Sequence, residues 1–463
     1  MRHPLHRLAV ALLLLLGLAS CSGDGPEFIW FRAIHAVPDA PDLRLRFDEY
    51  VYRERVTFGS ASQEGAESLL QSSAPPAAMT LEYFAPNNQL GDTVLTLDVP
   101  VQQDAISTVV LAGSFDSVEP VVVVTPRRPR PLGSLYFQFV HAVPDEGPLD
   151  VYVTAPDTEL TATAPLATIQ SLGHSESLEV PFGATRIRLT AAGSLDVIMD
   201  SGELDFAAQE GSPVGPGAEW LFAVSPSIVP GPAPVFLVGS NGRGAATFFA
   251  DGTPATLRAF NAARSRPAVD IAALTEPSEV LATDIGFRQR SALVPAPIGE
   301  YTLQFRPAGQ PDEAIANVAA AMSPAGEYAA ILREQGDISI AGFFQSNTRA
   351  VVTAGKLRFA HLAGNTGPIS AYLTESEDEA PDASNRLLFQ RPPGDVTSHL
   401  TVAPRDYFLT VTLSAAEGAE NETVLAGPLP LAVEGGEVFT FGLFEPDNEG
   451  EPPLLVQFDD RMP

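Results

Sequence analysis

Hydrophobic and polar residues alternate in short runs along the chain, and four of these runs share one pattern. The runs align on His35, His141, Asn261 and His361, with apolar residues four and two positions earlier and a polar residue between them. The apolar residues are Phe31, Ala33, Phe137, Phe139, Leu257, Ala259, Leu357 and Phe359, and the polar ones are Arg32, Gln138, Arg258 and Arg358. Because successive strand side chains point to opposite faces, the pattern predicts four strands with apolar side chains inward and polar side chains toward solvent.

A second run follows each of the first at a constant distance. Arg44, Asp150, Asp270 and Ser370 lie nine residues after the His or Asn of their run, each flanked by apolar residues. The same argument predicts a second strand with the polar side chain outward. A spacing held four times indicates a repeated unit, and we expect about four domains of one kind in tandem.

Turn-forming residues separate the runs. The chain holds 42 prolines and 37 glycines between runs rich in Val, Leu, Phe and Thr, and long amphipathic helical patterns are absent. This punctuation favours all-β sandwiches. Runs at 177–180, 291–294 and 399–402 precede a proline and a further run, and we interpret them as hairpins. Late core strands are predicted at 109–111, 220–224, 328–332 and 439–443.

These elements divide the chain into an all-β tandem array. We expect the β-sandwich repeats at 28–126, 132–240, 254–348 and 355–463. Each holds roughly 110 residues, enough for a domain to bury its own core. The proline-rich segment at 125–131 predicts a stiff boundary, and the glycine-rich segment at 239–244 predicts a flexible one. A third boundary is predicted near 346–349. The simplest arrangement is four beads on a string.

The N-terminus has the pattern of a targeting segment. Arg2 and Arg7 precede an apolar stretch that ends in small residues before Cys21, the only cysteine. This predicts a signal peptide at 1–20 whose cleavage site resembles the bacterial lipobox, so that Cys21 carries lipid and 21–27 forms a tether. The apolar stretch is short for a transmembrane span. An ordinary secretory signal is the alternative.

The residue after the cysteine helps to predict the localisation of the protein. In the bacterial lipoproteins that this N-terminus resembles, a residue other than Asp at this position implies transfer to the outer membrane, and here it is Ser22. We therefore expect an extracytoplasmic protein, lipid-anchored to the outer membrane on its periplasmic or surface face.

Charge and cysteine content narrow the function classes. The formal net charge is -30, from 57 acidic and 27 basic residues, and Lys356 is the only lysine. Such a charge disfavours nucleic acid as a partner. It fits a salt-adapted surface, a solubility device or genomic base composition, and these explanations stay open. With one cysteine, the domains cannot be cross-linked by intramolecular disulfides, so their stability must come from packing.

A pentapeptide, HAVPD, occurs twice, at His35 to Asp39 and at His141 to Asp145. Together with the run 31–41 and the segment 267–271, it resembles the bacterial domain-of-unknown-function family 4397. The resemblance implies extracytoplasmic tandem domains with an immunoglobulin-like antiparallel β-sandwich fold. It implies no reaction, because the family has no agreed catalytic role. The fourth unit departs from the motif at 362–365, and the third has Asn261 in place of His.

The repeated polar residues have a structural and a functional interpretation. On the predicted strand the His position faces inward, so we expect His35, His141, Asn261 and His361 to bond the backbone of the following turn. Metal binding is the alternative for the histidines, but no second ligand recurs at metal-site spacing. Asp39 and Asp145 follow a proline, and we expect their carboxylates to accept backbone N–H groups two residues on, with calcium binding as the alternative.

Enzyme motifs are absent from the sequence. The segment 173–177 approaches a nucleophile elbow but has Ser where the closing glycine belongs, and no H-E-x-x-H, P-loop or dinucleotide motif occurs. We therefore predict no catalytic, cofactor-binding or metal-binding residue, and no cofactor. Trp220 begins a predicted core strand, and Trp30 lies on a polar face, where it covers a packing or ligand surface.

The expected function is that of a non-enzymatic cell-envelope lipoprotein, a structural, spacer or protein-interaction module. One alternative is recognition of polysaccharide or another envelope component, through an exposed aromatic platform or an interdomain groove. A second is an extracytoplasmic hydrolase with its site between units, which would place converging titratable groups in one cleft. In each case the functional surface is expected where the units differ.

Overall fold

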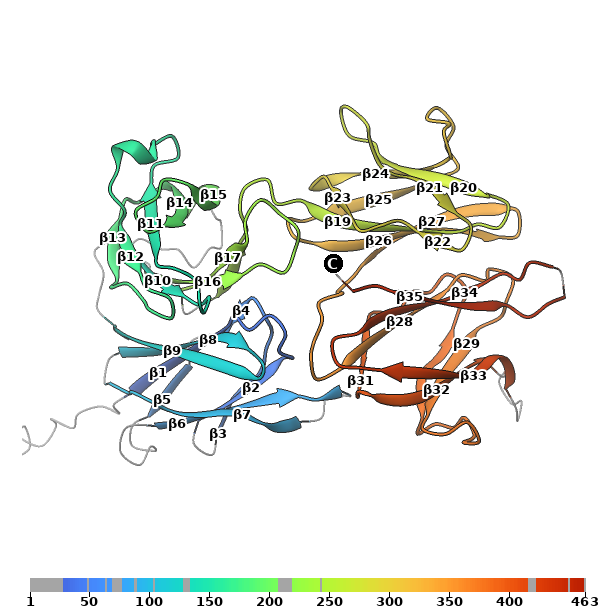
Figure 1. Ribbon diagram of the computed structural model, residues 1–463, viewed down its shortest axis with the longest axis horizontal. Coiled ribbons are helices and arrows are strands. Elements are labelled where there is room, and N and C mark those ends of the chain that lie inside the picture. Colours follow the sequence, from blue (N-terminus) through green and yellow to red (C-terminus); the bar gives the residue numbers. More distant parts are fainter. Residues whose placement is uncertain are drawn as a thin grey trace, which may run out of the picture.

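The computed structural model describes residues 28–47, 50–62, 65–68, 77–86, 90–102, 105–127, 134–206, 219–241, 244–414, 422–448 and 450–461. These residues form 35 strands and the 3-10 helix η2 (Leu160–Ala162), gathered into four two-sheet sandwiches (Figure 1). The prediction of an all-β tandem array is confirmed. Cys21, the predicted signal peptide and the predicted tether lie outside the described residues.

The four sandwiches are named units 1 to 4 in chain order. Unit 1 contains β1 (Phe28–His35), β2 (Leu43–Phe47), β3 (Tyr50–Val56), β4 (Ser60–Ala61), β5 (Gly65–Ser68), β6 (Ala77–Phe84), β7 (Leu90–Val99), β8 (Ala105–Ser114) and β9 (Ser117–Pro126). Unit 2 contains β10 (Leu135–His141), β11 (Leu149–Thr154), β12 (Ala167–Ile169), β13 (Leu178–Val180), β14 (Ala184–Ala191), β15 (Val197–Asp205), β16 (Glu219–Pro226), β17 (Val235–Ser240) and β18 (Ala245–Phe248).

Units 3 and 4 repeat this order. Unit 3 contains β19 (Ala255–Ala262), β20 (Ala268–Ala273), β21 (Glu279–Gly286), β22 (Gln289–Arg290), β23 (Val294–Ala296), β24 (Gly299–Pro307), β25 (Ala316–Met322), β26 (Glu327–Gln335) and β27 (Ile338–Gln345). Unit 4 contains β28 (Gly355–His361), β29 (Ile369–Thr374), β30 (Arg386–Arg391), β31 (Leu400–Val402), β32 (Arg405–Leu413), β33 (Thr423–Val433), β34 (Val438–Phe444) and β35 (Leu454–Asp459).

Each unit consists of a His-strand sheet, which contains its first strand, and a second sheet. In the His-strand sheet the first strand pairs in parallel with a late strand, as β1 with β8, β10 with β16, β19 with β26 and β28 with β34. The other pairs of these sheets are antiparallel. The second sheets, ordered β3-β2-β6-β7, β12-β11-β14-β15, β21-β20-β24-β25 and β30-β29-β32-β33, are antiparallel throughout. The sandwiches are therefore antiparallel except for one parallel pair each.

The inner faces of the two sheets enclose a separate core in each unit. The eight apolar residues predicted to face inward on the first strands are all buried, as are those flanking Arg44, Asp150, Asp270 and Ser370. Alternation along a strand therefore identified the core faces correctly. In unit 2 the core is mainly aromatic around Phe222, whose ring stacks on both Phe139 and Trp220.

The outer faces of the His-strand sheets do not face solvent, contrary to the prediction. Arg32, Gln138, Arg258 and Arg358 are only 4%, 4%, 5% and 2% exposed. The reason is that the units pack in pairs through these faces, unit 1 on unit 2 and unit 3 on unit 4 (Figure 1). Strand alternation distinguishes two faces but does not show whether the second face meets water or another domain. The arrangement of beads on a string is therefore wrong for this chain.

Some outward positions of the second sheets are buried as well. Asp150 is 5% exposed and Ser370 is fully buried, although both were expected to face solvent. The Asp150 carboxylate accepts a hydrogen bond from the Gly193 N–H at 2.8 Å, so the turn between β14 and β15 covers it. Asp270 accepts in the same way from the Gly309 N–H at 2.9 Å. These side chains therefore brace hairpin turns.

Two further expectations need correction. The predicted hairpins after 177–180, 291–294 and 399–402 are crossings between sheets. The strand β13 pairs with β10 whereas β14 pairs with β11, and the pairs β23 and β24 and β31 and β32 divide in the same way. The segment 239–244 is not a domain boundary, because β18 pairs with β17 and extends unit 2 to Phe248. Asn and Gly mark a hairpin turn as readily as a linker.

Candidate functional site

The repeated His and Asn side chains are buried at the end of the first strand in each unit. Ring Nε2 of His35, His141 and His361 lies 3.0 to 3.1 Å from the carbonyl oxygens of Pro41, Gly147 and Gly367, respectively. Because a carbonyl only accepts, Nε2 carries the proton. Nδ1 of His35 and of His141 accepts the N–H two residues on, at 3.3 Å. The rings therefore fasten the following turn to the strand.

Asn261 performs the same task in unit 3. Its Nδ2 donates to the carbonyl oxygens of Arg266 at 2.9 Å and Ile285 at 3.0 Å, and its Oδ1 accepts the Ala263 N–H at 3.1 Å. Burial lowers the pKa of His35 to about 4 and lowers those of His141 and His361 as well. The rings are therefore neutral at pH 7, which leaves Nδ1 of His35 and of His141 free of a proton and able to accept. Nδ1 of His361 has no hydrogen-bond partner among the described residues.

A repeated hydroxyl, which the sequence reasoning missed, supports the same strand. The N–H groups of Ala33, Phe139, Ala259 and Phe359 donate to the hydroxyls of Ser62, Ser175, Ser291 and Thr397 at 2.9 to 3.1 Å. Ser175 belongs to the segment 173–177, and its own hydroxyl donates to the Glu176 carbonyl at 2.8 Å. That hydroxyl is therefore committed to the backbone.

The two HAVPD aspartates differ in their surroundings. Asp39 accepts a hydrogen bond from the Phe115 N–H at 2.9 Å, in the turn between β8 and β9, and not from the backbone two residues on. Asp145 is exposed, with a left-handed φ of 61°. In the described part of the chain, no group of three or more His, Cys, Asp or Glu side chains could hold a metal ion.

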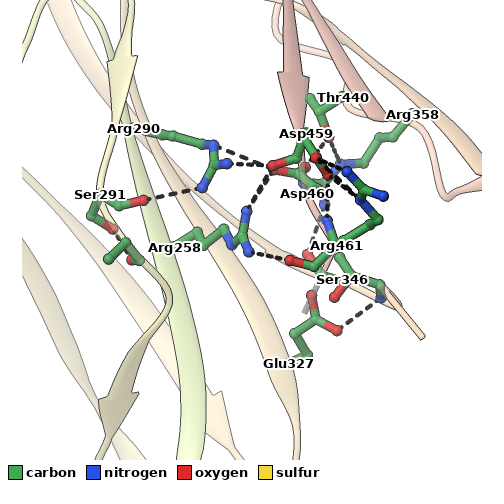
Figure 2. A network of polar contacts seen from close by, with 12 residues as sticks. Arg258, Arg290, Ser291, Glu327, Ser346, Arg358, Thr440, Asp459, Asp460 and Arg461 are labelled. Atoms are coloured by element: carbon green, nitrogen blue, oxygen red, sulfur yellow. Dashed lines mark hydrogen bonds and ion pairs between the residues drawn. The ribbon is translucent and has the colours of Figure 1, made fainter. Parts of the chain in front are cut away.

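A cluster of charged side chains joins units 3 and 4 (Figure 2). Asp460 is fully buried and accepts from Arg258 Nη1 at 2.9 Å and Arg358 Nη2 at 3.2 Å, with Arg290 Nε at 3.6 Å. The Thr440 hydroxyl also donates to it. Two of these arginines occupy the repeated outer-face position, so this Asp460 cluster holds the faces together.

The segment 346–354, which links unit 3 to unit 4, docks on the first HAVPD turn. Arg349 Nη1 donates to the carbonyl oxygens of Pro38 at 2.9 Å and Ala40 at 2.6 Å. The Val352 N–H donates to the Asp39 carbonyl at 3.0 Å. A turn in unit 1 thereby holds a linker more than 300 residues away in the sequence. The contact connects the pair of units 1 and 2 to the pair of units 3 and 4.

Two cavities flank this linker, with volumes of about 250 Å³ and 560 Å³. Both are lined by Asn347, Arg349, Ser398 and His399. The smaller, here called the junction cavity, also contains Lys356 and is otherwise lined by units 1 and 4. The larger adds residues of units 2 and 3. All four units therefore meet at one place, which is the candidate functional site.

The junction cavity brings cationic groups together. Lys356 is 6% exposed, and its Nζ donates to Asn347 Oδ1 at 3.0 Å. Within the described ranges, no carboxylate lies at ion-pair distance from Lys356 or Arg349. Burial lowers the pKa of Lys356 to about 8, and repulsion from Arg349 adds to this, against the attraction of Glu327 and Asp42.

His399 lines both cavities. Burial, together with repulsion from Arg358 and Lys356, lowers the pKa of His399 to about 2. The ring is therefore neutral at pH 7, and its Nε2 has no hydrogen-bond partner among the residues that the structure describes. The sequence reasoning did not select Lys356, Arg349 or His399, although Lys356 was identified as the only lysine.

The comparisons with known proteins concern the N-terminal part of the chain most directly. The family described as Domain of unknown function (DUF4397) matches residues 30–152, which run from the first strand of unit 1 into the second strand of unit 2. This confirms the resemblance found in the HAVPD region. No curated protein matches the chain.

Among solved structures, the chain is similar to the Bacillus anthracis TIE protein at 11% sequence identity. The match covers 91% of this chain and 69% of that one, with a TM-score of 0.16. A likeness at that score carries no argument about arrangement or function.

Proposed function

We propose that the protein is a non-enzymatic, lipid-anchored module of the cell envelope, whose four sandwiches act as one block. The observation that carries the proposal is the burial of the repeated outer faces in two unit pairs, together with the docking of the linker on unit 1. Domains held in this way cannot swing independently as a flexible spacer would. The block presents the loops in which the units differ as its interaction surface.

The repeated polar residues fit a structural role. His35, Asn261 and their counterparts are used in hydrogen bonds to turns, and Ser62 and its counterparts in bonds to strands. Repeated residues of this kind maintain the fold in each unit and leave partner choice to the variable loops. An envelope protein or a polysaccharide is the partner class for these loops, and nucleic acid is disfavoured by the net charge of -30.

Membrane attachment through Cys21 is part of the proposal. In the described part of the chain, no helix has the length and apolar character needed to cross a bilayer. Lipid on the N-terminal cysteine would hold the block at the outer membrane, with 21–27 as tether.

Metabolic acyl labelling with membrane fractionation tests this attachment. The wild-type chain is expected to carry label and to fractionate with the outer membrane, and Cys21→Ala is expected to lose both. Labelling that persists in Cys21→Ala, or a wild-type chain in the cytosol, would contradict the anchoring.

The hydrolase alternative expects titratable groups that converge in one cleft, and Lys356, Arg349 and His399 do converge. Lys356 and Arg349 are nevertheless hydrogen-bond donors only. Catalysis by a hydroxyl or thiol nucleophile needs that group hydrogen-bonded to a base, and His399 Nε2 makes no such bond among the described residues. The second candidate function is therefore ligand recognition, and the cationic junction cavity is the observation that favours it.

A further inference from the structure

Lys356 has an unusual position for the only lysine of an acidic chain. Lysine side chains normally keep their ammonium group in water, and a buried charge is normally paired. Here the side chain is 6% exposed, and Asn347 is its one hydrogen-bonding partner among the described residues. An ammonium group has three donors, so part of its hydrogen-bonding capacity stays unused.

The neighbouring charges do not fully compensate this ammonium group. Asp42 pairs with Arg55 at 2.7 Å, and Glu327 accepts the Thr348 N–H at 2.8 Å, so both acids already have partners. Arg349 adds a second cation to the same cavity, with one of its terminal nitrogens bonded to backbone carbonyls. The buried Lys356 and the half-buried Arg349 thus share a hollow with no carboxylate at ion-pair distance from either, within the ranges described.

We propose that the junction cavity binds a small oxyanion, a molecule bearing a carboxylate or a phosphate, with Lys356 and Arg349 as its charged donors. Charge-assisted hydrogen bonds from these two residue types are the usual means of holding such groups. The cavity volume of about 250 Å³ lies below the usual range for drug-sized ligands, so the ligand is small. The one carboxylate in the described lining, Asp42, is paired with Arg55 at 2.7 Å, and the His399 ring is neutral.

The rest of the chain makes this site distinctive. With a net charge of -30, the protein repels anions generally, so an anion site needs cations gathered at one place. Since the cavity is lined by unit 1, the linker and unit 4, a bound anion would also connect the two unit pairs.

The single lysine provides a direct experiment on the full chain. Acetic anhydride would be applied with and without inorganic phosphate or glucuronate, the phosphate and carboxylate probes. Cleavage after Arg349 and Arg358 then releases residues 350–358 for mass spectrometry. We expect either probe, or both, to slow acetylation of Lys356 about tenfold at saturation, because the bound anion covers Nζ. The probe that protects tells phosphate from carboxylate. An unchanged acetylation rate with both probes would overturn the proposal.

Matched variants give an independent readout. Lys356→Met keeps the length of the side chain and removes the charge, whereas Arg405→Met removes an exposed charge outside the cavity. We expect the probe to raise the melting temperature of the wild type and of Arg405→Met equally. In Lys356→Met, which should fold because it removes a buried cation, we expect affinity to fall about tenfold or more. Full anion stabilisation retained in Lys356→Met would refute the site.

Discussion

The interface between units 1 and 2 and the one between units 3 and 4 use the same outer face of the repeat in different ways. Between units 1 and 2, twelve buried apolar residues form the contact, and Arg32 donates to the neutral oxygens of Thr108 and Ser240. Between units 3 and 4 there are seven, and Arg258 and Arg358 converge on the buried Asp460. Arg258 and Arg358 thus share one buried carboxylate, whereas Arg32 bonds to oxygens of at least two different residues. We expect the second interface to depend more on a single residue.

The largest effect is expected from Asp460→Ala. Removing this carboxylate leaves Arg258 and Arg358 buried without their acceptor, and breaking a buried ion pair in this way costs about 3–5 kcal/mol. Both tryptophans, Trp30 and Trp220, lie in units 1 and 2. In a urea titration of Asp460→Ala, circular dichroism should therefore show that units 3 and 4 lose their β-structure at a lower urea concentration than in the wild type. Tryptophan fluorescence, which reports on units 1 and 2, should change little over that range.

The control for Asp460→Ala is Asp459→Ala, which removes a neighbouring carboxylate from an exposed pair with Arg461. Exposed pairs contribute about 0–1 kcal/mol, so the transition should hardly move. Equal effects of the two substitutions would mean that burial of Asp460 does not matter.

A somewhat smaller loss of stability, seen only at acidic pH, is expected at the interface between units 1 and 2. The His35 ring contacts Phe58, which in turn contacts Phe236 of unit 2. The folded pKa of His35 is lowered to about 4 from 6.5, so the unfolded state takes up the proton first as the pH falls. Stability from the neutral ring is complete above pH 6.5 and is lost toward pH 4, by about 3 kcal/mol.

The test of this pH dependence is His35→Asn, because Asn261 makes the equivalent bonds in unit 3. Urea midpoints from tryptophan fluorescence should fall more steeply between pH 6.5 and 4 in the wild type than in the variant. Parallel pH profiles would show that His35 is not the titrating group.

The smallest effect is expected from removing one methyl group from the apolar contact between units 1 and 2. Ile34 is fully buried between units 1 and 2, and Ile34→Val should cost about 1 kcal/mol in the tryptophan-detected transition. Ile338→Val, at a position that is 67% exposed, should cost almost nothing. If Ile34→Val were as harmless as Ile338→Val, the face of unit 1 would be in water.

The inner cores and the role of the repeated His could be predicted because both depend on local pattern. Phe31 and Ala33 share a face through strand alternation alone, and Asn261 in place of His indicated a hydrogen-bonding role, which the contacts of His35 and Asn261 show. The hydroxyls of Ser62 and Ser175 escaped notice because loops of different length separate them from their strands.

The pairing of units and the junction cavity could not be read from the sequence, because both depend on contacts between distant segments. Arg32 and Ser240 are 208 residues apart, and Arg349 and Pro38 are 311 apart. Asp460 lies after the last strand, outside any repeated position. The sequence pattern of an arginine between two apolar residues is the same whether its guanidinium group contacts water or a carboxylate.

Small-angle X-ray scattering of the full chain tests the central claim, that the repeats are packed in pairs and not strung out. Four domains of about 110 residues placed in a square should give a radius of gyration of about 27 Å, and the same domains in a line about 40 Å. The packed arrangement predicts the smaller value at neutral pH. A value near the larger one would contradict it.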